Sequence, residues 1–322
     1  MTQEKFISGY GGFALSAAIA FLMGGVAFML GGDYPGTASR GFFFPAPQCW
    51  NLLPWVSFLL EWGVLFLCAV MIIAIKKRFN FIPTLTKIPA SLFIICAGAC
   101  TSLSTRLCSS SFLALSAIAS LWLLFSRYRK GSAAESLFLV GLIASAGSFF
   151  DYSFIALVPA YIAGAVILKV SGPREMLALV LGAATPWWIA GGLTFFSFTG
   201  LECRAFSSLS PLVSAADGIG GGYIFILYVT AIILFYLADL VPLSSAGISA
   251  RNMNKAIAVP AFLTVILVFA GFPSSDVYGA PLALFASFMA GYFCASRRGV
   301  ARPVWWICLL SSLSLFIVSV YV

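Results

Sequence analysis

The stretch WVSFLLEWGVLFLCAVMIIAI, residues 55–75, is followed directly by Lys76-Lys77-Arg78. A helix crosses the hydrocarbon core of a membrane with about 20 predominantly apolar residues, and this stretch has that length. Lysine and arginine are enriched in the cytoplasmic loops that flank such helices. The stretch therefore predicts a transmembrane helix that ends at the cytoplasmic face of a membrane.

The composition extends this prediction to the whole chain. Of its 322 residues, 61% are hydrophobic and only 9% are charged, whereas about a quarter of the residues of a soluble domain are charged. The apolar residues form long blocks, which excludes a water-soluble core. We therefore predict an all-α integral membrane protein, a polytopic helical bundle with a single transmembrane domain over residues 1–322.

About eleven apolar runs are candidate membrane spans. Their approximate bounds are 11–30, 55–75, 88–102, 107–125, 135–150, 153–168, 176–196, 223–241, 256–272, 278–295 and 304–322. With the N-terminus in the cytoplasm and the C-terminus outside, only Arg40, Arg106 and Arg204 of the 18 Lys and Arg residues lie outside. Because the Lys and Arg balance of short loops sets orientation, the sequence predicts this threading and excludes the opposite one.

A reporter that is active only in the cytoplasm tests this orientation. Fused after Lys130 or Arg298, it is expected to give a signal, because both positions follow basic clusters. Placed at Ser210 or after Val322, it is expected to be silent. Silence at Lys130 together with a signal at Ser210 would overturn the orientation and the placement of every candidate site residue below.

The composition also excludes several classes of function. The net charge is +8, but the basic residues lie in short clusters between apolar runs, which indicates contact with anionic lipid headgroups and no nucleic-acid partner. The chain has no His, so a histidine metal site and a Ser-His-Asp triad are excluded. No CxxC pair occurs, so a zinc ribbon is not supported. We expect no cofactor and no metal centre.

Two predicted outer loops carry the unusual polar content. The loop at about 31–54 contains Asp33 and Arg40. In the loop at about 197–222, apolar residues recur at helical spacing from Leu201 to Ala216, which predicts a short amphipathic helix in the membrane interface. Asp217 opens the glycine-rich end of this loop, which we predict to be a flexible entry into the next span. Cysteines also fall near this face, and a disulfide between two of them is left open: Cys49, Cys108 and Cys203.

Two acidic residues lie within apolar runs, where a charge costs a few kcal/mol and often marks function. Glu61 is about two turns into its run. Its carboxylate is either functional or structural, and a structural one would bond to a neighbouring helix or pair with Arg40 or Arg106. Asp239 lies near the inner end of its run, where we expect it to reach the interface, so we give it less weight.

Small residues and prolines in the later runs predict how the helices pack. Gly141, Ala144 and Gly147 favour the close approach of a neighbouring helix. Pro159, Pro186, Gly191-Gly192 and Pro260 indicate either kinks and packing, which neighbouring helices in a bundle can accommodate, or a broken helix around a substrate.

The polar residues of the outer face form the candidate site. Asp33 is the candidate catalytic residue, as a base or a metal-binding carboxylate. Arg40 or Arg106 would hold a phosphate. The remaining candidates for substrate binding are Glu61, Asp151 and Asp217.

Several short patterns between residues 81 and 192 carry a resemblance. They are Ile82-Pro83, Lys87-Ile88-Pro89-Ala90, Phe138-Leu139-Val140-Gly141-Leu142, Phe149-Phe150, Arg174-Glu175, Leu181-Gly182 and Pro186. With these patterns the segment resembles a family of uncharacterised multi-spanning inner-membrane proteins of Bacteroidetes, which carries no established activity.

Glycine-rich hairpins, a basic inner loop and a proline-containing span are also distantly similar to membrane glycosyltransferases of the GT-C class. Those enzymes use polyprenyl-linked sugars at the outer face, with a catalytic acid in the first outer loop, where this chain has Asp33. Their fuller acidic motif and soluble C-terminal domain have no counterpart here.

The sequence leaves three functions open. The first is a component of envelope assembly in the bacterial inner membrane that binds a lipid-linked or amphiphilic substrate at the outer leaflet. The second is a secondary transporter of a small solute with Glu61 as its coupling or substrate site. The third is a non-catalytic scaffold for other envelope proteins. In each case membrane lipids are partners.

Overall fold

The structure is a computed structural model that describes residues 7–30, 42, 44–82, 87–128, 132–192, 219–245, 247–270, 275–297 and 299–321. Every secondary-structure element in these ranges is a helix. Six of the helices are long and apolar enough to cross a membrane. The chain is therefore an all-α membrane protein, as its composition predicts.

Each of the eleven predicted runs overlaps one helix or a pair of helices. The α-helices are α2 (Tyr10–Met29), α3 (Pro54–Phe79), α4 (Ile88–Ala99), α5 (Thr101–Ser104), α6 (Ser109–Arg127), α7 (Ala134–Ser148), α8 (Ser153–Ala156), α9 (Val158–Ile167), α10 (Pro173–Gly192), α12 (Ile219–Ser245), α13 (Ile248–Phe269), α14 (Gly279–Ser296) and α15 (Ala301–Tyr321). Two short 3-10 helices, η1 (Pro47–Cys49) and η3 (Ser275–Tyr278), complete the described elements. The number of helices that cross the membrane stays a prediction, because α4, α7, α8–α9 and the 226–240 part of α12 are shorter apolar helices and α10 is not among the six.

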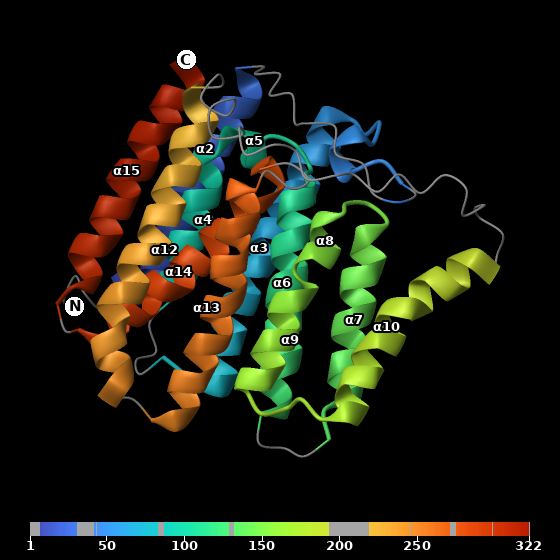
Figure 1. Cartoon of the computed structure of the whole chain (residues 1–322). Helices are drawn as coiled ribbons and strands as arrows, with labels where there is room; N and C mark the ends of the chain where they lie inside the picture. The colour runs from blue at the N-terminus through green and yellow to red at the C-terminus, as the bar shows by residue number, and fades with distance from the viewer. Residues whose placement is uncertain are drawn as a thin grey trace.

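The helix ends gather at two opposite ends of the bundle, as the alternating threading requires. The C-terminal ends of α6, α9 and α12 lie at the lower end in Figure 1, together with the N-terminal ends of α7, α10 and α13. We call this the inner end, because the threading predicts that it faces the cytoplasm. The opposite end, which carries α5 and α8, is the outer end. At the inner end Arg127 and Glu135 form an ion pair, with 2.5 Å between the Nη2 and Oε2 atoms.

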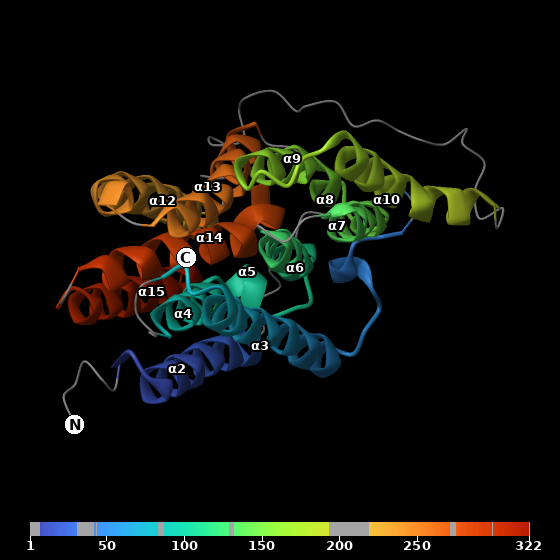
Figure 2. The same cartoon turned by 90° about the horizontal axis from the view of Figure 1, so that it is seen from below.

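The core of the bundle is built around α4 and α14, which Figure 2 shows between the outer helices. Every residue of α4 except Cys96 is buried, and α14 is buried from Gly279 to Tyr292. Their backbones approach closely, since a Cβ on Gly291 would overlap the ring of Pro89. Helices that are apolar on all sides are typical of such interior positions.

Helices α7 and α10 make a second close contact. A Cβ on Gly141 would overlap the carbonyl oxygen of Leu179, and a Cβ on Gly182 would overlap that of Phe138. The prediction that small residues of this run allow close helix approach is confirmed at Gly141. The sequence alone could not show that Gly182 of α10 makes the matching close contact with α7.

Several helix boundaries differ from the predicted ones. The run 88–102 is interrupted at Cys100, and the run 153–168 is divided at Leu157. Pro159 lies in the first turn of α9. Backbone N–H groups in a first turn have no partner within the helix, so proline, which has no N–H, is tolerated there. Helix α13 begins at Ile248 and so includes polar residues that were predicted to precede it.

The glycine-rich segment 219–222 is helical and starts α12, so the predicted flexible entry is wrong there. Glycine costs about 1 kcal/mol relative to alanine in a helix. An unpaired backbone group in hydrocarbon costs several kcal/mol. Helix formation is therefore favoured from the first residues of this apolar element.

Candidate functional site

The described residues contain three of the six predicted site residues. Glu61 lies on α3, Arg106 lies just before α6, and Asp151 lies between α7 and α8. Asp33, Arg40 and Asp217 lie outside the described residues, as does the predicted interfacial helix at 201–216. Cys203 lies outside them too, while Cys49 and Cys108 are both free thiols.

Glu61 is fully buried and caps the N-terminus of the neighbouring helix α6. Its Oε2 atom accepts a hydrogen bond from the backbone N–H of Cys108 at 3.1 Å. Its Oε1 atom accepts one from the hydroxyl of Ser111 and one from the thiol of Cys108 at 3.6 Å. The first N–H groups of a helix have no partner within it, and a carboxylate there also interacts favourably with the helix dipole. Of the two interpretations of Glu61, this geometry supports a bond to a neighbouring helix.

Two further side chains, one from α3 itself and one from the 44–50 segment, complete this arrangement, which we call the α6 cap. Ser57, one turn before Glu61 on α3, accepts a hydrogen bond from the backbone N–H of Leu107 at 2.9 Å. The Gln48 side-chain oxygen accepts bonds from the backbone N–H and the hydroxyl of Ser109, both at 3.3 Å. The α6 cap therefore comprises Gln48, Ser57 and Glu61, and it joins the 44–50 segment to α3 and α6.

Asp151 and Arg106 are not part of the α6 cap. Asp151 is fully buried in the α7–α8 turn, and its Oδ1 atom accepts bonds from the backbone N–H of Ser153 at 2.9 Å and from its hydroxyl at 2.7 Å. This is the usual way in which an aspartate starts a turn or a helix. Arg106 is exposed, two residues before Cys108.

An aromatic cluster holds the 42–50 segment against the outer ends of α7 and α10. The backbone N–H groups of Phe42 and Phe44 donate to the carbonyl oxygens of Ser148 and Phe149 at 3.2 and 2.9 Å, which satisfies two groups at the C-terminal end of α7. The rings of Phe44 and Phe150 stack with their centroids 5.3 Å apart. The other ring pairs of the cluster are Phe42–Tyr152, Phe42–Trp187, Trp50–Phe150 and Phe149–Trp187.

A groove of about 360 Å³ lies beneath this segment, between α6 and α7. Its walls are aromatic and aliphatic, with Trp50, Phe112 and Phe150 among them. Pockets of about 300–1,000 Å³ with apolar walls and a few polar groups are typical of small-molecule sites. We call it the outer groove; Phe112 of its wall follows Ser111 in α6, and Trp50 belongs to the same segment as Gln48.

The sequence singled out Glu61 but not the residues that bind it. Ser109-Ser110-Ser111 opens α6, and all three are buried, with Ser110 Oγ accepting a bond from the backbone N–H of Ala280 at 2.8 Å. A run of three serines before an apolar stretch is a helix-start signal that could have pointed to these contacts. Their partners on α3 and α14 are too distant in the sequence to be inferred.

Asp239 differs from its prediction. Its side chain is fully buried, and neither carboxylate oxygen has a hydrogen-bond partner among the described residues. It does not reach the surface of the chain, because α12 packs against α14 at this position. Arg297 lies beside it, donating to the carbonyl oxygen of Ala238 at 3.5 Å.

No group of three or more potential metal ligands occurs in the part of the chain that the structure describes. Comparisons with protein families, with curated proteins and with solved structures found no match to this chain.

Proposed function

We propose that this chain is a component of envelope assembly in the bacterial inner membrane, which binds a lipid-linked or amphiphilic substrate at the outer leaflet. The observation that carries the proposal is the apolar groove beneath the 44–50 segment. Its aromatic and aliphatic walls suit the hydrocarbon chain of an amphiphile, and Ser116 is the polar side chain among the residues that line it.

The polar end of the substrate would lie toward the outer surface. Arg106 is exposed there and can pair with a phosphate. Asp33 and Arg40, from the same outer loop as Gln48, are the proposed catalytic and phosphate-binding residues. The distant similarity to GT-C glycosyltransferases supports a polyprenyl-linked substrate. We also propose, as a separate step, that the protein acts catalytically on it.

The geometry favours this function over transport. A coupling carboxylate must exchange its partners during a transport cycle. The Glu61 carboxylate already accepts bonds from Cys108 and Ser111 at a helix terminus, and it does not line the outer groove.

Filling the outer groove provides the test. Ala119 lines it, and Ala119→Phe is expected to reduce labelling by a photoreactive polyprenyl phosphate in liposomes by at least about fivefold. The physical reason is that the phenylalanine ring takes up space that a hydrocarbon chain would occupy, and a loss of about 1 kcal/mol in binding is about fivefold in affinity. Labelled peptides, identified by mass spectrometry, are expected to contain Trp50, Phe112 or Phe150.

Ala184→Phe is the matched control, because Ala184 is exposed on α10, and it should leave labelling unchanged. Equal labelling of all apolar helices, unaffected by Ala119→Phe, would contradict binding in the groove. In cells, a deletion strain is expected to change its lipid or glycan profile, and Asp33→Asn should reproduce that change if the protein is an enzyme. An unchanged envelope in the deletion strain would remove the proposal.

A further inference from the structure

We propose a second lipid site at the opposite, inner end of the bundle: a groove between α9, α12 and α13 that binds an anionic phospholipid of the inner leaflet. It does not depend on the proposed function, because it shares no residue with the outer groove. Its volume is about 490 Å³, within the range of small-molecule sites.

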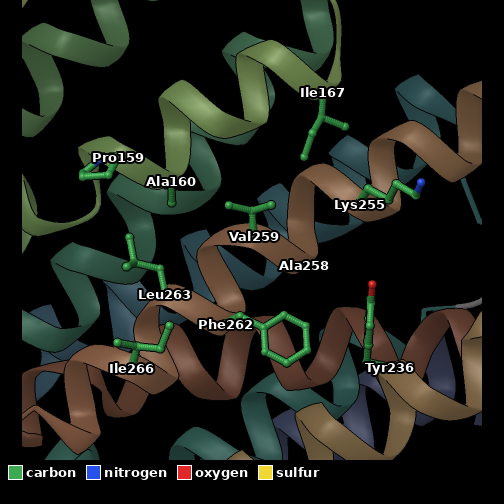
Figure 3. A pocket seen from close by; sticks show the side chains of 10 residues that line it. All are labelled: Pro159, Ala160, Ile167, Tyr236, Lys255, Ala258, Val259, Phe262, Leu263 and Ile266. Atoms are coloured by element: carbon green, nitrogen blue, oxygen red, sulfur yellow. The ribbon is translucent and has the colours of Figure 1, made fainter.

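The groove is apolar along its length and polar at one end. Figure 3 shows Lys255 and the Tyr236 hydroxyl at one end, with Pro159, Leu263 and Ile266 toward the other. Lys255 is exposed and is the only charged residue among those that line the groove. Tyr236 is held in place by an edge-to-face contact with Phe262, with ring centroids 5.0 Å apart. One cation at the end of an apolar channel complements an anionic headgroup on a hydrocarbon chain.

Further cations surround the polar end. Arg251 lies one turn before Lys255 on α13, so both are on the same side of that helix. The Arg251 Nε atom is buried and has no hydrogen-bond partner among the described residues. On α9, Ile167 lines the groove and exposed Lys169 follows two residues later. Basic residues near a membrane surface attract anionic lipids, each by an amount that corresponds to about fivefold in binding.

The length of the groove agrees with the thickness of one leaflet. Lys255 and Ile266 are eleven residues apart on α13, which corresponds to about 16 Å along a helix that rises about 1.5 Å per residue. Half of a hydrocarbon core of about 30 Å is about 15 Å. A headgroup at Lys255 would therefore place its acyl chain beside Val259, Leu263 and Ile266 as far as the midplane.

Native mass spectrometry of the full chain tests this site, with phosphatidylglycerol and phosphatidylcholine of identical acyl chains as the probes. The wild-type protein is expected to retain phosphatidylglycerol about fivefold or more over phosphatidylcholine. Lys255→Ala should remove most of this preference. Val259→Trp, which fills the groove, should remove the retained lipid of both kinds. Ile266→Trp should also fill the groove and remove the retained lipid. Because Ile266 is 61% exposed, this variant does not disturb the packing of the core.

Two variants serve as controls. Lys77→Ala removes an exposed inner-end cation on α3, and Val180→Trp adds a ring at an exposed position of α10; neither should change lipid retention. Equal retention of both lipids by wild type and Lys255→Ala would overturn the proposal. A dimer that dissociates on Ile266→Trp would also overturn it, by assigning the groove to a second copy of the chain. Loss of retention here with normal labelling of the outer groove would leave the proposed function intact.

Discussion

Replacing Gly182 with valine is expected to lower the apparent melting temperature of the purified protein in detergent by about 2–12 °C. A Cβ at this position would overlap the carbonyl oxygen of Phe138 on α7, and backbone cannot move aside as a side chain can. Overpacking a well-packed contact costs about 1–3 kcal/mol, and each kcal/mol is about 2–4 °C for a domain of 150–250 residues. Gly141→Val meets the carbonyl oxygen of Leu179 and should act in the same direction.

Gly63→Val is the matched control, because a Cβ at Gly63 would meet no atom within 4 Å. It makes the same chemical change in another apolar helix, where valine has a slightly better helix propensity than glycine. Its melting temperature should equal or exceed that of the wild type. Equal losses in Gly63→Val and Gly182→Val would contradict close packing of α7 against α10.

Replacing Glu61 with leucine is expected to destabilise the α6 cap by about 1–3 kcal/mol, the usual cost of leaving a buried donor without an acceptor. The backbone N–H of Cys108 and the hydroxyl of Ser111 would both lose their acceptor. Glu61→Gln keeps one side-chain oxygen and should lose less. The melting temperature in detergent should therefore be highest for the wild type, lower for Glu61→Gln and lowest for Glu61→Leu.

Cysteine labelling gives this prediction a local measurement. Cys108 is half-buried beside Glu61, whereas Cys49 is exposed and serves as an internal reference. Maleimide labelling of Cys108 relative to Cys49, followed by peptide mass spectrometry, should be faster in Glu61→Leu than in the wild type. Glu135→Gln is the control, since that carboxylate is 75% exposed. Unchanged labelling and stability in Glu61→Leu would exclude a capping role for Glu61. The alternative, a coupling or substrate site in a transporter, would then be favoured.

The positions of the apolar helices could be predicted well from the sequence, and the candidate site only in part. All eleven predicted runs overlap helices, because unpaired backbone groups cannot be tolerated in hydrocarbon and a long apolar run therefore forms a helix. The errors are at boundaries, as at Ile219 and Ile248, where polar or glycine residues continue a helix beyond its apolar part. Glu61 stood out as an acid in an apolar run, but its role could not be decided there.

The sequence by itself determined that this is a membrane protein and predicted its threading, because run length, apolarity and Lys and Arg placement are properties of single segments. Only the tertiary structure decided that Glu61 meets Ser111 and that Asp239 faces α14. It also brought Lys255 of α13 beside Ile167 of α9, and it formed the outer groove between α6 and α7. These are contacts between helices, and helices that are apolar on most sides carry little pattern to indicate which neighbours they will pack against.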